Sequence, residues 1–313
     1  MRGARVLITC RQMQSCIEEF RAGFDERDIE IALPEVVQQP TEDELIATIG
    51  EFDGMIAGDD PITARVLEHA VRMRIISKWG VGTDGIDKEA ARALGIEVTN
   101  TPGVFGAEVA DVALGYLVMI ARQLHRIDAS VKGGGWFKHE GRSLSGKTMG
   151  VAGFGSIGQA VARRAFGFGM EVVAHDVVEA ARGPAADLGV QLVDRDELFR
   201  RSDALVLCCP LTPETHHMVD VATLALLPHG AYLLNVARGP LVDETALVEA
   251  LGSGRVRAAA LDVFEAEPLP RDSPLRQFEQ CVFGSHNGSN ATEGVLRASA
   301  RAVENLFAGL DRA

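Results

Sequence analysis

The residues with the clearest chemical potential are three glycines in residues 146–176, GKTMGVAGFGSIGQAVARRAFGFGMEVVAHD. Gly153 permits a tight exit from the apolar run before it, Gly155 lets a pyrophosphate approach the backbone, and Gly158 lets the following helix pack closely on a sheet. A glycine-rich turn alone is a weak signal, but here a strand precedes it and a helix follows. The segment therefore predicts a dinucleotide-binding βαβ unit.

The residues around this turn indicate which dinucleotide binds. The N–H groups of Ser156 and Ile157 would face the phosphates at the start of the helix, where the helix dipole favours negative charge. Asp176 ends the second strand, near the position roughly 20 residues on where a ribose-binding acid is expected. Its carboxylate can accept ribose hydroxyls but would repel a 2′-phosphate, and the two valines that follow offer no arginine. We therefore expect NAD rather than NADP.

Three polar residues further along could carry acid–base chemistry. Arg238, Glu267 and His286 each follow a predicted strand, which puts them at the ligand edge of a parallel sheet. Arginine can hold a carboxylate through two charge-assisted hydrogen bonds, and histidine can exchange a proton near neutrality when a carboxylate orients its ring. Each residue taken alone more often has a structural role, as a surface ion pair, a solvated loop acid or a structural histidine.

An α/β architecture is expected to position these residues, because short β-rich runs alternate with helical patterns. Such runs are expected at residues 5–10, 29–33, 54–58, 74–77, 96–99, 203–208, 231–236, 257–262 and 281–284. Thr41 and Glu44 have the spacing of a capping box at the start of a helix. A long amphipathic helix is expected after the NTPG turn that ends at Gly103, and the chain length suits two domains.

The loop KWGVGTDG, residues 78–85, has two interpretations. Gly80 and Gly82 could leave backbone N–H groups facing an anion, or they could simply form a tight turn. Trp79 could line the mouth of a substrate site or pack in the core.

Composition limits the partners. The net charge of −13 repels polyanions, so nucleic acid and anionic membranes are poor candidates. The five cysteines lack a repeating spacing and are expected to be reduced, and no metal-ligand spacing joins the histidines. No signal peptide or membrane span is recognisable, so a cytoplasmic location is expected.

Several longer segments resemble successive signatures of the D-isomer-specific 2-hydroxyacid dehydrogenases. They read GVAGFGSIG, CPLTPET, NVARGPLVDETAL, LDVFEAEPLP and GSHNGSNAT, and the likeness runs from about Val6 to the last helix. The resemblance implies an NAD-dependent oxidoreductase acting on a small 2-hydroxy or 2-keto acid of the 3-phosphoglycerate, glycerate/hydroxypyruvate or glyoxylate class.

The resemblance also assigns roles to residues. Arg238 binds the substrate carboxylate with help from the Val81 and Gly82 amides, Glu267 pairs with the histidine, and His286 is the acid/base. The residues implied for the substrate are Trp79, Gly80, Val81, Gly82, Arg238 and His286. Those implied for NAD are Gly153, Gly155, Ser156, Ile157, Gly158, Asp176, Pro210, Thr215, Val236, Ala237, Arg238, Asp262, His286, Gly288 and Ser289.

The same resemblance implies two doubly wound parallel-sheet lobes. A Rossmann NAD domain, residues 101–286, would be inserted in a flavodoxin-like substrate domain, residues 1–100 and 287–313. It would form a homodimer through the helix after Gly103, as in the short members without a regulatory domain.

Some residues depart from the family pattern. Ser285 replaces the usual proline before the histidine, and Asp111 stands in VAD where VAE is usual. In GDDPIT, Asp59 and Asp60 occupy a region where phosphoglycerate-type members place an arginine, so a phosphorylated substrate is disfavoured, although Arg11 could supply the charge from another loop.

Two other functions compete with this one. Some relatives are NAD(H)-sensing corepressors that keep the fold without significant turnover, but the retained arginine, glutamate and histidine argue against that role. Formate or phosphonate dehydrogenase is a second alternative, for which the additional substrate-site residues are not found.

Overall fold

The computed structural model describes residues 3–36 and 39–312. The chain divides into two compact units, residues 1–104 with 290–313, and residues 105–289. The chain thus leaves the first unit, builds the whole second unit and returns for its last helix. These boundaries lie a few residues beyond those expected from the sequence.

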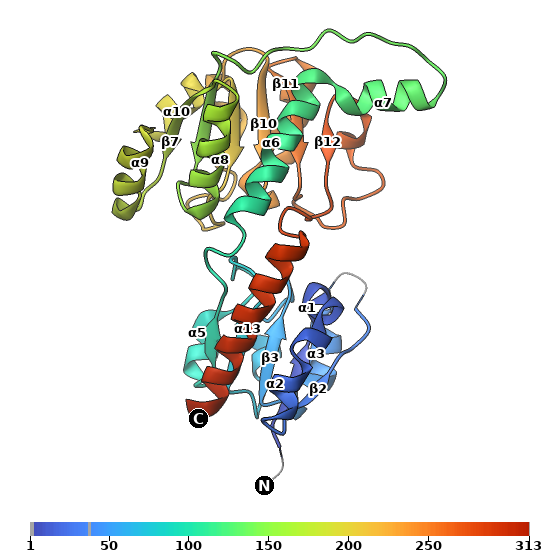
Figure 1. Cartoon of the computed structure of the whole chain (residues 1–313), viewed down its shortest axis with the longest axis vertical. Coiled ribbons are helices and arrows are strands. Elements are labelled where there is room, and N and C mark those ends of the chain that lie inside the picture. Colours follow the sequence, from blue (N-terminus) through green and yellow to red (C-terminus); the bar gives the residue numbers. More distant parts are fainter. Residues whose placement is uncertain (1–2, 37–38, 313) are drawn as a thin grey trace. The chain divides into compact units, whose positions relative to one another are not determined.

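The first unit is built on a five-stranded parallel sheet with the order β2-β1-β3-β4-β5 (Figure 1). Its strands are β1 (Arg5–Ile8), β2 (Glu30–Ala32), β3 (Gly54–Ala57), β4 (Ile75–Lys78) and β5 (Glu97–Thr99). This is the flavodoxin-like order of doubly wound sheets. All five strands lie within the runs expected from the sequence or extend one residue beyond them.

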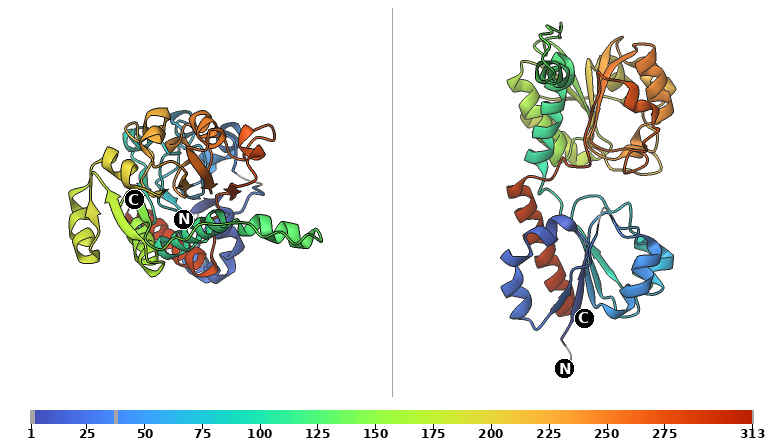
Figure 2. Two further views of the ribbon diagram at one scale, coloured as in Figure 1. Left: turned by 90° about the horizontal axis from the view of Figure 1, so that it is seen from above. Right: turned by 90° about the vertical axis from the view of Figure 1, so that its right-hand side faces the viewer.

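Helices cover both faces of this sheet (Figure 2). They are α1 (Arg11–Ser15), η1 (Ile17–Glu19), α2 (Arg21–Asp25), α3 (Glu42–Thr48), η2 (Ile49–Glu51), α4 (Ala64–Leu67), α5 (Lys88–Ala93) and α13 (Thr292–Arg312). Helix α3 begins with the predicted capping box, since the Thr41 hydroxyl accepts from the Glu44 amide and the Glu44 carboxylate accepts from the Thr41 amide. The long helix α13 packs on β3 and β4, so the end of the chain completes the core that its beginning started.

The second unit contains a seven-stranded parallel sheet with the order β12-β11-β10-β9-β6-β7-β8. Its strands are β6 (Thr148–Ala152), β7 (Glu171–His175), β8 (Gln191–Leu192), β9 (Ala204–Leu207), β10 (Ala231–Asn235), β11 (Val256–Leu261) and β12 (Val282–Phe283). The order reverses between β6 and β9, which is the switch point where such sheets bind ligands. The two-residue strand β8 was not predicted, because it is too short for a period-2 pattern.

Helices again cover both faces, with α6 and α8 on one face and α10 to α12 on the other (Figure 2). The helices of this unit are α6 (Gly106–Arg122), α7 (Leu124–Lys132), α8 (Ser156–Gly167), η3 (Glu179–Ala181), α9 (Arg182–Leu188), α10 (Arg195–Arg201), α11 (Val221–Leu226), η4 (Gly239–Leu241), α12 (Glu244–Gly252) and η5 (Pro274–Gln277). The apolar face predicted for α6 is buried at Val109, Ala113, Leu117 and Ile120. None of the described helices is long and apolar enough to cross a membrane.

Helix α7 differs from the others because it extends away from the body of its unit (Figure 1). Gln123 separates it from α6 with a left-handed backbone, φ 54°, which breaks the helix. None of the α7 residues is buried, and the loop that follows exposes Trp136.

Candidate active site

The glycine-rich turn follows β6 at the switch point and leads directly into α8. Gly153 has φ 91°, and a Cβ atom there would lie 2.6 Å from the Cys209 amide nitrogen. A Cβ atom on Gly158 would lie 2.2 Å from the Gly153 carbonyl oxygen, whereas one on Gly155 would meet no atom within 4 Å. The chain's own packing therefore requires the first and third glycines, and the second leaves open space where a ligand's phosphates fit.

Asp176 is fixed at the end of β7 beside this turn. One carboxylate oxygen accepts from the Phe154 amide at 2.6 Å and the other from the Val178 amide at 2.8 Å. These bonds hold the carboxylate next to the glycine turn, where a ribose hydroxyl could reach it.

A hollow of about 320 Å³ lies beside Asp176. Its lining comprises His175, Asp176, Val177, Val178, Glu179, Arg182, Leu192 and Val193. Arg182, from helix α9, also lines this hollow, and the residues directly after Asp176 gave no indication of it. Its guanidinium is paired with Glu179 at 2.8 Å. The open glycine, the start of α8 and the anchored acid together fit the adenosine and pyrophosphate of NAD.

The strand order of the seven-stranded sheet brings the three candidate catalytic residues to one edge of that sheet. Arg238 follows β10, Glu267 follows β11 and His286 follows β12, and these strands are neighbours in a parallel sheet. Carboxyl ends of neighbouring parallel strands share an edge, so residues distant in sequence are grouped there.

His286 and Glu267 form a direct pair, with the histidine Nδ1 2.8 Å from a glutamate carboxylate oxygen. The other carboxylate oxygen accepts from the Phe264 amide at 3.0 Å. Because an ionised carboxylate only accepts hydrogen bonds, the proton of a neutral His286 belongs on Nδ1. Nε2 is then the atom that can accept a proton from a substrate hydroxyl.

The backbone of His286 is held as firmly as its ring. Its amide donates to the Asp262 carbonyl at 2.7 Å, and its φ of 56° lies in the left-handed region. The Asp262 carboxylate accepts from the Gly288 amide at 2.7 Å and from the Tyr116 hydroxyl at 3.1 Å. Burial first, and then Asp262, raise the pKa of Tyr116. Tyr116 stands in the apolar stripe of α6, so the sequence pattern did not indicate this polar contact.

Asn235 anchors the loop that carries Arg238. Its side-chain amide nitrogen donates to the Arg238 carbonyl at 2.8 Å, and its side-chain oxygen accepts from the Ala237 amide at 3.1 Å. The Arg238 guanidinium donates to the Ala237 carbonyl at 2.8 Å. Asn235 was not among the residues predicted for the site, although a buried asparagine at the end of a strand is a recognisable signal for such an anchored turn.

Two further residues expected at the NAD site belong to the loop after β9. The Thr215 hydroxyl donates to the Pro210 carbonyl at 2.8 Å and accepts from the Thr212 amide at 2.8 Å. These bonds close the loop on itself and present it at the edge of the sheet.

In the first unit, the loop after β4 is partly committed to internal contacts. Trp79 is 5% exposed and its indole donates to the Ser299 hydroxyl at 3.0 Å, which favours packing. The Gly80 amide donates to the Thr101 hydroxyl at 3.0 Å. An anion would therefore be left to the amides of Val81 and Gly82.

The two aspartates after β3 have different environments. Asp60 is 2% exposed and accepts from the Thr9 hydroxyl at 2.6 Å, and burial raises the pKa of Asp60 to about 6. Asp59 is half-exposed and pairs with the buried Lys78 ammonium at 3.2 Å. Only Asp59 therefore presents its carboxylate to solvent.

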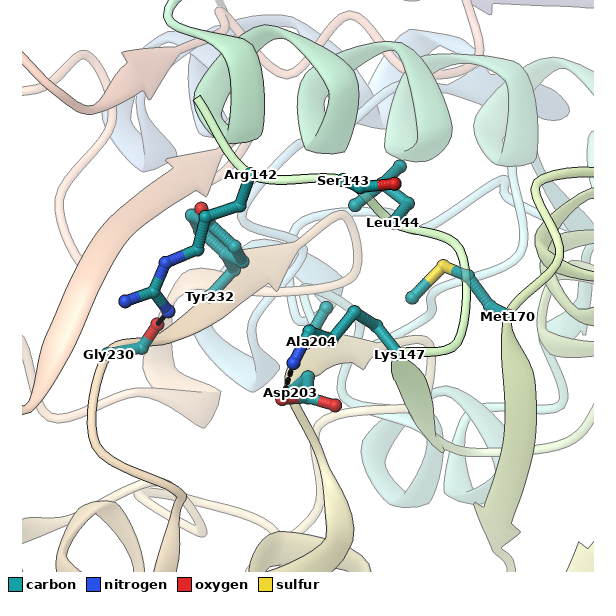
Figure 3. Close-up of a pocket in the computed structure, with 9 residues that line it drawn as sticks. All are labelled: Arg142, Ser143, Leu144, Lys147, Met170, Asp203, Ala204, Gly230 and Tyr232. Carbon is teal, nitrogen blue, oxygen red and sulfur yellow. Dashed lines mark hydrogen bonds and ion pairs between the residues drawn. The ribbon is translucent and has the colours of Figure 1, made fainter. Parts of the chain in front are cut away.

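A second hollow in the second unit lies at the opposite, amino-terminal edge of the sheet (Figure 3). It is lined by Arg142, Ser143, Leu144, Lys147, Met170, Asp203, Ala204, Gly230 and Tyr232. Its volume of about 10 Å³ suits at most one water molecule. Among residues 3–36 and 39–312, no group of three acidic, histidine or cysteine side chains is arranged to hold a metal.

Comparison with known proteins identifies the fold and the reaction. Residues 114–288 match the family model of the D-isomer specific 2-hydroxyacid dehydrogenase NAD binding domain. A hydroxypyruvate reductase of Thermotoga maritima is 40% identical over 271 residues, 85% of this chain and 87% of the relative. A D-3-phosphoglycerate dehydrogenase of Methanocaldococcus jannaschii is 39% identical over 281 residues, 88% of this chain but only 53% of the relative.

A solved structure covers both units. The D-lactate dehydrogenase of Aquifex aeolicus, complexed with NAD and lactic acid, has a TM-score of 0.85, 26% identity, and coverage of 98% of this chain and 95% of its own. With the NAD-type turn, the anchored acid and the histidine–glutamate pair in place, the cofactor is NAD. The chain belongs to the D-isomer-specific 2-hydroxyacid dehydrogenases, NAD-dependent oxidoreductases that act on 2-hydroxy acids.

Proposed function

We propose that the substrate is a small, unphosphorylated 2-hydroxy or 2-keto acid of the glycerate/hydroxypyruvate or glyoxylate class. The observation that carries the catalytic part is the 2.8 Å pair of His286 and Glu267 at the strand edge that also carries Arg238. The relatives named above supply the substrate class.

In the oxidative direction, His286 Nε2 accepts the hydroxyl proton of the substrate. The glycine-rich turn and Asp176 would hold NAD, whose nicotinamide would supply the acceptor for the hydride that leaves C2. Glu267 stabilises the imidazolium that results and keeps the ring oriented through Nδ1. Arg238 holds the substrate carboxylate and polarises the forming carbonyl, because its planar guanidinium can donate two parallel hydrogen bonds.

The charges after β3 and β4 support an unphosphorylated substrate. The Lys78 ammonium is occupied by Asp59 and by the Trp79 carbonyl, at 3.2 and 2.7 Å. Asp59 keeps its half-exposed carboxylate at this strand end, which would repel a phosphate. A small neutral group at C3, or none, meets no such repulsion.

An NADH-oxidation panel tests this proposal. The substrates are glyoxylate, hydroxypyruvate, pyruvate, phosphohydroxypyruvate and branched 2-keto acids. We expect the highest kcat/KM with hydroxypyruvate or glyoxylate, and a higher value with phosphohydroxypyruvate would refute the substrate assignment.

A variant separates enzyme from sensor. His286→Gln should lose most of kcat while binding NADH as tightly as the wild type, measured by the fluorescence of the bound nucleotide. Tight NADH binding by the wild type without turnover of any 2-keto acid would instead support the NAD(H)-sensing corepressor.

We propose further that the chain forms a homodimer through the α6–α7 region. Helix α7 has no buried residue, and apolar side chains are exposed on it and just after it: Leu124, Val131, Trp136 and Phe137. Exposed apolar groups gathered on one projecting segment are typical of an interface. Light scattering after gel filtration should show a dimer, and Trp136→Ser with Phe137→Ser should shift it toward monomer.

A further inference from the structure

Outside the residues discussed so far, the second unit contains another histidine–glutamate pair. His217, in the loop after β9, places its Nε2 2.5 Å from a carboxylate oxygen of Glu265. Glu265 lies two residues before Glu267, in the same loop. The two residues are 48 positions apart in the sequence, so no local pattern indicates this pair.

His217 contacts the loops of both proposed catalytic partners of His286. Its backbone amide donates to the Pro240 carbonyl at 2.8 Å, two residues after Arg238, while its side chain bonds Glu265. Its φ of 50° is left-handed, a conformation that histidine tolerates better than most residues. The residue therefore joins the loop after β10 to the loop after β11.

Those two loops also touch each other directly. A Cβ atom on Gly239 would lie 1.8 Å from the Phe264 carbonyl oxygen, so the backbones are in close contact. The Glu265 amide donates to the Glu244 carboxylate at 2.8 Å. Glu265 is thus tied through its backbone to α12 and through its side chain to His217.

Three carboxylates lie at the loop after β11: those of Glu244, Glu265 and Glu267. Burial, together with the negative charges of Glu265 and Glu267, raises the pKa of Glu244. A hydrogen bond donated to the Glu265 carboxylate therefore lowers the repulsion among the three carboxylates and keeps the loop in one conformation. An ionised Glu265 accepts, so His217 donates from Nε2.

We propose that His217 is a positioning residue for the dehydrogenase reaction. Through Glu265 it fixes the loop whose Glu267 orients the acid/base His286, and through Pro240 it keeps that loop in register with the loop of Arg238. This inference rests on the proposed roles of His286, Glu267 and Arg238.

The test compares His217→Ala with His216→Ala. His216 is the adjacent residue and is exposed, and its ring centroid lies 4.0 Å from that of His217. It therefore serves as the matched control. We expect His217→Ala to lower kcat about fivefold, a modest part of the roughly 10²–10⁴-fold effect of acid–base catalysis. NADH affinity and the unfolding temperature should stay at wild-type values, and His216→Ala should match the wild type throughout.

Two further variants separate positioning from a general structural role. His217→Gln, whose amide can still donate to Glu265, should recover most of kcat. Adding Glu265→Ala to His217→Ala should cost no more than either change alone, because both changes break the same contact. Unchanged kcat in His217→Ala, independent multiplying effects, or a loss of stability without rescue by glutamine would overturn the proposal.

A readout without turnover keeps this test distinct from that of the proposed function. Nitrogen-15 NMR of the His286 imidazole should show the Nδ1–H tautomer in the wild type and a mixed population in His217→Ala. That shift would support the positioning role even if none of the 2-keto acids were reduced, and an unchanged tautomer would refute it even in an active enzyme.

Discussion

We predict the effect of Asp60→Asn on the free energy of unfolding of the first unit. The difference between this variant and the wild type should shift in favour of the variant as pH rises. The Asp60 side chain is buried against Thr9, and its pKa is about 6 instead of the ordinary 3.8. Between pH 3.8 and about pH 6 the folded wild type keeps a proton on Asp60 that the unfolded chain has lost. Its free energy of unfolding therefore decreases as pH rises through this range. Asparagine has no charge to desolvate and keeps an acceptor for the Thr9 hydroxyl.

The magnitude follows from the two pKa values. At pH 8 the ionised carboxylate costs the wild type about 3 kcal/mol, and at pH 5 about 1.6 kcal/mol, at about 1.36 kcal/mol for each pKa unit. The stability difference between Asp60→Asn and the wild type should therefore grow by about 1.4 kcal/mol between pH 5 and pH 8.

Urea unfolding at the two pH values measures this difference. The chain has two tryptophans, and in a Trp136→Phe background the fluorescence of the buried Trp79 reports on the first unit. Asp43→Asn in the same unit is the matched control, because Asp43 pairs with Arg65, both side chains are exposed, and an exposed ion pair contributes only about 0–1 kcal/mol. A stability difference for Asp60→Asn that is the same at both pH values would refute the conclusion that burial raises this pKa.

Three other variants test separate contacts. Gly155→Ala should unfold like the wild type but bind NADH at least about tenfold more weakly. Gly158→Ala should lose stability, because its Cβ would overlap the Gly153 carbonyl. Equal effects of the two variants on unfolding would contradict the different roles given to these glycines. Arg238→Lys should raise the substrate KM more than it lowers kcat, since lysine cannot make two parallel hydrogen bonds, and steady-state kinetics would show the reverse if the arginine acted only in the transition state. Tyr116→Phe should lower the free energy of unfolding in urea by about 1 kcal/mol, because it removes one of the donors to the buried Asp262. An unchanged free energy of unfolding would show that this hydrogen bond makes no net contribution to stability.

The sequence predicted the elements better than the contacts between loops. Periodicity located the strands of both sheets and the buried face of α6, since these patterns depend on local spacing. The strand β8 was missed because two residues, Gln191 and Leu192, carry no period. The cap of α3 was predicted because its two residues are three positions apart.

The histidine–glutamate pair had a different basis. Strand ends placed Glu267 and His286 at one edge, but only the resemblance to a family paired them. Tyr116, Asn235 and His217 act across distances in sequence for which no local spacing exists, so residue patterns could not reveal them. Arg182 was overlooked because only the two positions after Asp176 were considered.

Asp262 explains why glycines flank His286 in the GSHNG segment. A Cβ atom on Gly284 would lie 2.0 Å from one Asp262 carboxylate oxygen, and a Cβ atom on Gly288 would lie 3.0 Å from the other. The same carboxylate accepts from the Gly288 amide, and its backbone accepts from the His286 amide. The loop must approach Asp262 this closely to make both bonds, and side chains at the two glycine positions would prevent it. The motif is therefore a packing requirement of a buried carboxylate, and the position of the histidine ring is its consequence.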